Sequence, residues 1–391
     1  MNFFKAAIKI NHKKMDILKE NKNRRKKKYV ISQHQLYMVR PDVWRKLKRA
    51  NRIDKEYRYV ARRISLYSYF SRPLQILQNN INRKKIRQVD LSRSAPVFVI
   101  GHWRSGTTFL HYILSKDKRF GYLCNYQALI FNIALLSKKM MRALSRPLFP
   151  KERPQDSIKM SPYYPAEEEQ PFTTTSTRSG MHTFFFPHNR SYFNKYNLFK
   201  GIAPKEKKHW KKDYLYLLKN ISLYNDNKPL LLKNPHNTGR VKELLELFPD
   251  AKFIFLHRDP YTTYMSMMHL FDTVVRTQFF QRISDAEIHE LVIYMFRETL
   301  KKYMADRSQV PEGNLVEVSY AELTGDPLGV VKNIYAKLGL PGYKDAEPNM
   351  RSHLQKVSDY KKNIFKEMPD EVKERLGKEL GFYFDVFAYE K

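Results

Sequence analysis

A loop near residue 100 has the residue types and spacing that bind phosphate. The pattern Gly-x-x-x-x-Gly-Thr-Thr spans residues 101–108 and directly follows an apolar run at 95–100. The backbone N–H groups of such a loop, with the N-terminus of the helix that follows, hold a phosphate group. Nucleotide triphosphatases place a lysine before the hydroxyl residue, but here Thr107 stands there and Arg104 supplies a cation inside the loop. For the glycine spacing alone, a tight strand-to-helix turn without a ligand is the alternative.

A second polar cluster lies at the end of another apolar run, at residues 252–257. A triphosphatase would carry an acidic metal ligand directly after this strand, whereas here the strand runs into His257 and Arg258. No set of His, Cys and Asp residues in the sequence has convincing metal-ligand spacing. The sequence therefore predicts a terminal 5'-phosphate held by arginine, hydroxyl groups and backbone amides, without a bound metal.

The loop residues resemble those of a known enzyme family. An apolar strand followed by Arg104, Ser105, Gly106, Thr107 and Thr108 is similar to the 5'-phosphosulfate loop of sulfotransferases that use 3'-phosphoadenosine 5'-phosphosulfate (PAPS). The resemblance extends over residues 95–340 and, through the runs at 231–236 and 247–252, is greatest to the bacterial and protein-tyrosine branches of that family. It implies PAPS as sulfonate donor, 3'-phosphoadenosine 5'-phosphate (PAP) as product, and a small-molecule hydroxyl compound as acceptor.

The family's 3'-phosphate site is matched as well. Its arginine at a strand end, with a serine eight residues later on the next helix, corresponds to Arg258 and Ser266. A guanidinium group and a hydroxyl two turns into the helix can converge on one phosphate, whose charge the helix N-terminus favours. The run at 318–323 is similar to the strand and turn in which the family's tyrosine lies near the adenine, which implies that role for Tyr320.

Sulfonate transfer needs in-line geometry, stabilisation of charge on the departing phosphate oxygen, and a base for the acceptor hydroxyl. Lys233 ends the apolar run at 229–232 beside the loop. We assign Lys233, together with Arg104, to neutralise the sulfonate and the bridging oxygen. A surface lysine is the alternative, but the leucines before it should be buried.

The sequence offers several candidates for the base. Glu167 and Glu169 belong to a run of three glutamates after Pro165, where bacterial members of the family carry a similar acidic cluster. Acidic residues in the first turn after a proline also simply stabilise a helix N-terminus. His236 has the right neighbourhood and a suitable ordinary pKa. The cytosolic sulfotransferases place a histidine two residues after the strand-end lysine, where this sequence has Pro235. A residue outside this set is a further alternative.

Apolar runs alternate with helical patterns along the chain, at 95–100, 229–232, 252–257 and 314–318. Short continuous apolar runs are typical of strands that are buried on both faces, and strand–helix alternation indicates a parallel sheet. The predicted fold is α/β and P-loop-like, with a central parallel sheet flanked by helices in three layers. Ligands of such sheets bind at the C-terminal ends of the strands, where every polar cluster named above lies.

The chain has 391 residues and a formal net charge of +33, which attracts a polyphosphorylated nucleotide, a nucleic acid or an anionic membrane. Basic runs at 13–14, 23–28 and 83–85 concentrate charge near the start. We expect residues 1–90 to form a basic, mostly helical N-terminal extension and residues 91–391 to form the sulfotransferase domain. A solvated helical layer packed on that domain is favoured over a dedicated lipid or nucleic-acid arm.

The segment 115–228 is expected to supply the acceptor pocket. It is rich in apolar and aromatic residues, among them Tyr122, Tyr126, Leu129, Ile130, Phe131, Leu135, Met140, Met141, Phe172, Phe184, Phe185 and Phe186. Most of these belong to the core, but a surplus favours a lipophilic alcohol such as a sterol or lipid over a sugar. The same chemistry on a carbohydrate, phenol or tyrosine is the alternative.

The compartment is inferred from cysteine usage and hydropathy. A single cysteine, Cys124, favours a reducing environment, no signal-peptide core precedes Lys9, and the apolar stretch at 128–136 is too short to span a bilayer. We expect a cytoplasmic protein, and peripheral contact with an anionic membrane is compatible with a lipid acceptor.

Two other functions are less consistent with the sequence. A nucleotide kinase is disfavoured by the missing loop lysine. A basic nucleic-acid-binding protein would leave both phosphate elements unexplained, so no nucleic-acid partner is expected.

Overall fold

The computed structural model describes residues 34–136, 160–357 and 367–391, together with residues 138, 143, 152 and 365. Within it, residues 35–391 form one compact unit. The predicted basic runs at 13–14 and 23–28, and the predicted pocket residues Met140 and Met141, lie outside the described residues.

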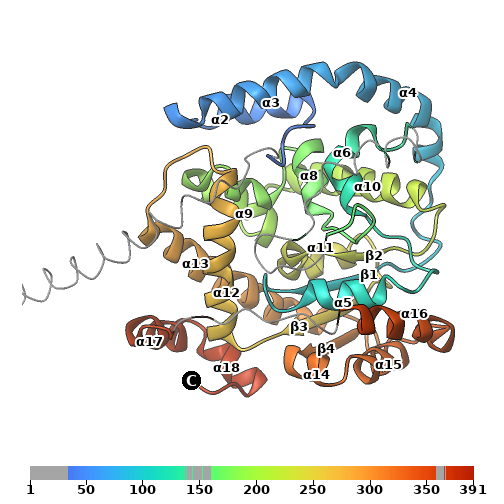
Figure 1. The fold of residues 1–391 in the computed structure, drawn as a ribbon, viewed down its shortest axis with the longest axis vertical. Helices are drawn as coiled ribbons and strands as arrows, with labels where there is room; N and C mark the ends of the chain where they lie inside the picture. Colours follow the sequence, from blue (N-terminus) through green and yellow to red (C-terminus); the bar gives the residue numbers. More distant parts are fainter. Residues whose placement is uncertain are drawn as a thin grey trace, which may run out of the picture. The chain divides into compact units, whose positions relative to one another are not determined.

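A parallel sheet lies at the centre of this unit (Figure 1). Its strands are β1 (Val97–Gly101), β2 (Leu231–Lys233), β3 (Lys252–His257) and β4 (Leu315–Ser319), in the spatial order β2-β1-β3-β4. Every neighbouring pair is parallel, and the register aligns Val99 with both Lys233 and Ile254. The first three strands are apolar and buried on both faces, which agrees with their origin in continuous apolar runs. The predicted α/β fold with a central parallel sheet is confirmed.

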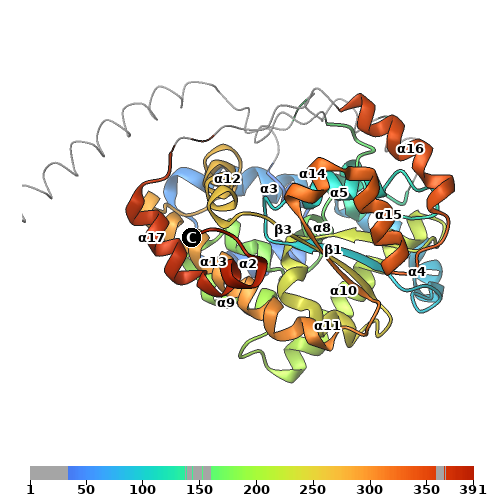
Figure 2. The same cartoon turned by 90° about the horizontal axis from the view of Figure 1, so that it is seen from below.

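Alternate residues of each strand point to opposite faces of the sheet, and each face is covered by its own helices. On one face, Val97, Val99 and Ile254 pack with side chains of α5 (Thr107–Leu114), α15 (Pro327–Lys337) and α16 (Tyr343–Lys356). On the other face, Phe98 and Phe253 pack with α10 (Pro204–Tyr224), α11 (Val241–Leu245) and α13 (Asp285–Asp306). Figures 1 and 2 show the three layers that result.

Further helical elements connect the strands and helices of these layers. They are α6 (Asn125–Ile130), η2 (Phe131–Ile133), α8 (Glu169–Thr175), η4 (Gly180–Phe184), η5 (Pro187–Asn189), α9 (Arg190–Leu198), η6 (Pro235–Arg240), α12 (Pro260–Thr273), η7 (Val275–Gln278), η8 (Arg307–Gln309) and α14 (Tyr320–Gly325). The C-terminal helices α17 (Asp370–Glu379) and α18 (Gly381–Phe387) pack against the core through Leu376 and Phe384.

Residues 41–88 are helical, forming α2 (Pro41–Ala50), α3 (Arg58–Phe70) and α4 (Arg72–Gln88), with the short η1 (Lys55–Tyr57) between the first two. Trp44 of α2 and Ile64 of α3 belong to the same apolar cluster as Phe98 of the sheet. These helices are therefore joined to the main core through buried side chains. A domain boundary at residue 90 stays a prediction. Within the described residues, no helix is long and apolar enough to cross a membrane.

Candidate active site

The loop between β1 and α5 is held in shape by contacts within the chain. Its left-handed residues are Arg104, with φ of 71°, and Gly106, with φ of 99°. The buried Ser105 hydroxyl donates a hydrogen bond to the His102 carbonyl at 2.8 Å, so this side chain closes the turn. At the strand end, the Gly101 N–H donates to the Thr238 hydroxyl at 2.8 Å. The loop is thus anchored to η6, the segment that follows the neighbouring strand β2.

Gly106 allows the loop to approach the end of β4. A Cβ atom at this position would lie 2.4 Å from Cδ2 of Tyr320, the first residue of α14, which is far inside van der Waals contact. The guanidinium carbon of Arg258 lies 4.2 Å from the centroid of the same tyrosine ring. Tyr320 is therefore packed between the loop glycine and the arginine that follows β3.

The two predicted phosphate elements meet in the structure, although they are far apart in sequence. Arg104 Nε donates to Ser266 Oγ at 2.9 Å, and Arg258 Nη1 donates to the Arg104 carbonyl at 3.1 Å. Ser266 lies on α12, whose first residue directly follows the Arg258–Asp259 pair. Two guanidinium groups and a hydroxyl at one loop form a site suited to an anion that carries more than one phosphate.

Lys233 connects this loop to the carboxylate run. It ends β2 directly beside β1, and only 3% of its surface is exposed. Its ammonium group lies 3.3 Å from the Thr108 hydroxyl in the first turn of α5 and forms an ion pair with Glu167. Because the Glu167 side chain remains 20% exposed, this carboxylate stays accessible beside the lysine.

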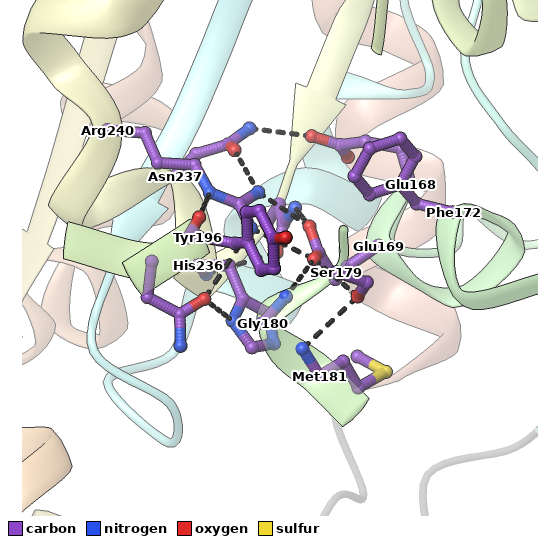
Figure 3. A network of polar contacts seen from close by, with 12 residues as sticks. Glu168, Glu169, Phe172, Ser179, Gly180, Met181, Tyr196, His236, Asn237 and Arg240 are labelled. Atoms are coloured by element: carbon purple, nitrogen blue, oxygen red, sulfur yellow. Dashed lines mark hydrogen bonds and ion pairs between the residues drawn. The ribbon is translucent and has the colours of Figure 1, made fainter. Parts of the chain in front are cut away.

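Glu169 lies in a fully buried polar network (Figure 3). Arg240 donates to both of its carboxylate oxygens, at 2.6 and 2.9 Å. The Ser179 hydroxyl, the Gly180 N–H and the Asn234 amide donate at 2.7, 3.2 and 3.0 Å. Burial alone would raise the pKa of Glu169, but the Arg240 charge and these hydrogen bonds hold that pKa well below its usual range. The carboxylate is ionised and both of its oxygens are engaged.

Glu168, between these two glutamates, points to a different set of partners. Its Oε1 accepts hydrogen bonds from the Tyr214 hydroxyl at 3.0 Å and from the Asn237 amide at 2.7 Å. Its other oxygen is buried without a hydrogen-bond partner among the described residues. Burial raises the pKa of Glu168 to about 7. Consecutive carboxylates of the run therefore have three different environments.

His236 lies in an aromatic setting beside the loop. Its Nδ1 is 2.7 Å from the Asn197 side-chain oxygen, so Nδ1 carries the proton in this contact, and its ring centroid is 4.7 Å from that of Trp103. Phe184 packs against both rings, with centroid distances of 6.1 and 6.2 Å. Burial lowers the pKa of His236 to about 4, which keeps the imidazole neutral at neutral pH.

Residues of η6, and Asn234 directly before it, complete the site and were missed by the sequence analysis. Asn234, Asn237 and Arg240 bind the carboxylates of Glu168 and Glu169. Thr238, in the same segment, holds the loop between β1 and α5 at Gly101. The available signal was the cluster of five polar residues within 234–240, Asn-Pro-His-Asn-Thr-Gly-Arg, after a buried strand. Its partners, however, are identifiable only once the segment at 167–169 is placed beside it.

A parallel α/β fold with an arginine-containing phosphate loop, a second arginine–serine element and a buried strand-end lysine defines a nucleotide-dependent transferase. The Sulfotransferase family model matches residues 96–345, and the chain belongs to this family. It is therefore a sulfotransferase, with PAPS as donor. Among the described residues, no group of three or more His, Cys, Asp or Glu side chains could hold a metal ion.

Sequence relatives agree with the family, and solved structures agree with the fold. The chain is 30% identical, over 296 residues, to the omega-hydroxy-beta-dihydromenaquinone-9 sulfotransferases Stf3 of Mycobacterium bovis and Mycobacterium tuberculosis, covering 76% of this chain and 76% of each relative. The fold is similar to that of sulfotransferase STF9 from Mycobacterium avium, with a TM-score of 0.65, 17% identity and coverage of 90% and 97% of the two chains. The fold is also similar to that of sulfotransferase STF1 from Mycobacterium tuberculosis, with a TM-score of 0.54 and 21% sequence identity. This match covers 81% of this chain and 86% of the STF1 chain.

Proposed function

We propose that this chain transfers the sulfonate of PAPS to the hydroxyl group of a lipophilic alcohol, with Glu167 as base. The observation that best supports this proposal is the position of Lys233, which contacts Thr108 of the glycine-rich loop on one side and Glu167 on the other. A cation in that place is adjacent both to the phosphosulfate and to the base. Arg240 is paired with Glu169 in the buried network, whereas Lys233 contacts both the loop and Glu167.

The donor would be held at both of its phosphate ends. Residues 104–108 would bind the 5'-phosphosulfate through backbone N–H groups, the Arg104 guanidinium and the threonine hydroxyls. Arg258 and Ser266 would bind the 3'-phosphate, and Tyr320 would lie against the adenine. Support for this arrangement comes from the hydrogen bonds that join Arg104 to Ser266 and to Arg258.

In the reaction, the acceptor oxygen forms a bond to sulfur while the bond between sulfur and the bridging phosphate oxygen breaks. The acceptor proton passes to the Glu167 carboxylate, and the bridging electron pair leaves with PAP. Lys233 and Arg104 would neutralise the charge that develops on the departing oxygen. Glu169 is unsuited to be the base because both of its oxygens already accept hydrogen bonds, and we propose a positioning role for it.

A lipophilic acceptor is supported by the aromatic wall beside the loop. Trp103 is itself a loop residue and packs on Phe184, which in turn packs on Phe271 at a centroid distance of 5.6 Å. His236 belongs to this wall as a neutral ring, and its Nε2 is buried without a hydrogen-bond partner among the described residues. The relatives named above act on an omega-hydroxy-dihydromenaquinone. Peripheral contact with an anionic membrane, in which such an acceptor would be dissolved, is part of this proposal.

Two measurements test the proposal. Calorimetry with PAP, in the presence and absence of a chelator, should give the same binding because both phosphates are met by protein groups. Binding that requires magnesium would contradict the donor arrangement. Turnover of labelled PAPS over a panel of long-chain alcohols, sterols, phenols, sugars and tyrosine peptides should favour the lipophilic compounds. Turnover of sugars or peptides alone would remove the lipophilic acceptor and leave the sulfotransferase.

A further inference from the structure

The helices α3 and α4 carry a stripe of exposed apolar side chains. Ser71 joins the two helices through backbone hydrogen bonds on both sides, since its N–H donates to the Tyr67 carbonyl and its carbonyl accepts from the Gln75 N–H. The stripe consists of Tyr59, Leu66, Phe70, Leu74, Leu77 and Ile81, all at least 43% exposed, and Phe70 is 82% exposed. These residues recur at steps of three, four or seven, so they share one face of the helices. We call this face the α3–α4 stripe.

The orientation of α4 is the reverse of an ordinary surface helix. Ile86 near its end is its one buried apolar residue, whereas Gln75, Gln78 and Asn82 are buried and Leu74, Leu77 and Ile81 are exposed. The buried amides are satisfied by specific partners, as Gln78 donates to the Phe131 carbonyl and accepts from the Leu135 N–H. A helix that needed only to cover the core would bury its apolar face instead. The exposed apolar face of α4 is therefore available to something outside the unit.

The charges around the α3–α4 stripe indicate what that partner is. Residues 58–88 contain eight arginines and lysines and no aspartate or glutamate. Arg62 and Arg72 are exposed near its middle, and Lys84 and Lys85 are exposed near its end. An anionic lipid surface matches both properties, because it accepts apolar side chains at the acyl boundary and attracts the flanking cations. A second copy of this chain would bring two surfaces of the same positive sign together.

The α3–α4 stripe lies over the part of the chain that leads to the candidate base. Beneath α4, Gln78 binds the segment of η2, whose Asn132 donates to the Met38 carbonyl and to the Thr174 hydroxyl. Thr174 belongs to α8, the helix that begins at Glu169. Figure 1 shows α8 between the helices α2 to α4 and the sheet. A surface bound at the stripe is thus connected to the helix of the carboxylate run through buried hydrogen bonds of α4 and η2.

We propose that the α3–α4 stripe docks this enzyme on an anionic lipid bilayer, from which a lipophilic acceptor is taken. The reason for docking depends on the proposed function, because a lipophilic acceptor is dissolved in the bilayer. The docking surface itself is inferred from the apolar and basic residues of α3 and α4. The sequence locates the membrane contact only in the basic character of residues 1–90. The structure assigns the membrane contact to one face of α3 and α4, and the apolar residues of that face are required for binding.

Flotation of the full-length protein with vesicles tests this proposal. Vesicles of phosphatidylcholine mixed with phosphatidylglycerol should bind the protein, and added salt should weaken binding. Vesicles of phosphatidylcholine alone should bind it far more weakly. The variant Leu66→Ser/Phe70→Ser/Leu77→Ser should lose at least about tenfold in binding. The variant Lys84→Gln/Lys85→Gln should lose on the order of tenfold.

Each variant has a control of the same chemical kind elsewhere on the surface. Val386→Ser removes an apolar side chain that is 48% exposed on α18, and Lys205→Gln/Lys208→Gln removes the same charge from exposed positions of α10. Both controls should bind vesicles like the unmodified protein. Equal losses in the control and stripe variants, or equal binding to both kinds of vesicle, would overturn the proposal.

The failure of docking and the failure of the enzyme assignment give different results. The stripe variants should keep their affinity for PAP, because α3 and α4 contribute none of the proposed donor residues. Unmodified protein that binds PAP but floats with neither vesicle would refute docking and leave the sulfotransferase in place. Light scattering measures the oligomeric state. If the unmodified protein is a dimer that the Leu66, Phe70 and Leu77 substitutions dissociate, the stripe is an interface between copies of the chain. That result would refute the membrane assignment.

Discussion

The run of glutamates at 167–169 offers a direct test of the site, because its members have different environments. We expect Glu169→Gln to destabilise the protein and Glu167→Gln to slow the chemical step. Glutamine keeps the shape of each side chain and removes its charge, so each variant is a control for the other. In Glu169→Gln, the Arg240 guanidinium stays fully buried and loses its counter-charge.

The size of the Glu169→Gln effect follows from that burial. Removing one partner of a buried ion pair costs about 3–5 kcal/mol of the free energy of unfolding. The entropy of unfolding is about 2.1 cal/mol/K per residue, or about 0.8 kcal/mol/K for this chain of 391 residues. The Tm should therefore fall by about 4–6 °C. Glu167 is partly solvated, so its substitution should lower Tm less, while loss of a general base should lower kcat about 10²- to 10⁴-fold.

Three measurements separate these effects. Thermal unfolding gives Tm, calorimetry gives the affinity for PAP, and single-turnover transfer from labelled PAPS gives the rate of the chemical step. For Glu167→Gln, PAP affinity should stay near that of the unmodified protein while transfer is lost. For Glu169→Gln, Tm should fall, and the protein that remains folded below Tm should still bind PAP. The reasoning is refuted if Glu169→Gln keeps its Tm and loses transfer, since Glu169 would then act in the chemistry and not in the buried network.

Two further predictions concern the donor site and the buried carboxyl. Arg258→Ala should weaken PAP binding about tenfold to a hundredfold, since charged hydrogen bonds are worth about 1.5–3 kcal/mol, and unchanged calorimetric affinity would remove Arg258 from the donor site. The pKa of Glu168, about 7 in the folded protein, exceeds the ordinary value of 4.5, so the native state binds more protons between these pH values and its free energy of unfolding falls as pH rises through them. In urea unfolding, Glu168→Gln should therefore gain stability relative to the unmodified protein between about pH 5 and pH 8, by up to about 3 kcal/mol. An identical pH dependence of both proteins would show that Glu168 is not held protonated by burial.

The sequence by itself determined the fold class and the place of the glycine-rich loop after the first strand. Both are encoded locally, because an apolar strand followed by glycines, an arginine and threonines allows few other structures. It also indicated that Arg258 would join that loop, since the C-terminal ends of parallel strands lie at one edge of a sheet. The observed β2 begins and ends slightly later than the apolar run at 229–232, because its pairing with β1 decides the boundary.

Only the tertiary structure decided what each carboxylate does. The sequence presents Glu167, Glu168 and Glu169 as equivalent neighbours, and their differences come from partners such as Arg240, which is 71 residues from Glu169. The orientation of α4 was also invisible in the sequence, because burying Gln78 and exposing Leu77 runs against the usual amphipathic rule. Charge state and exposure depend on contacts between segments far apart in the chain, and those contacts exist only after folding.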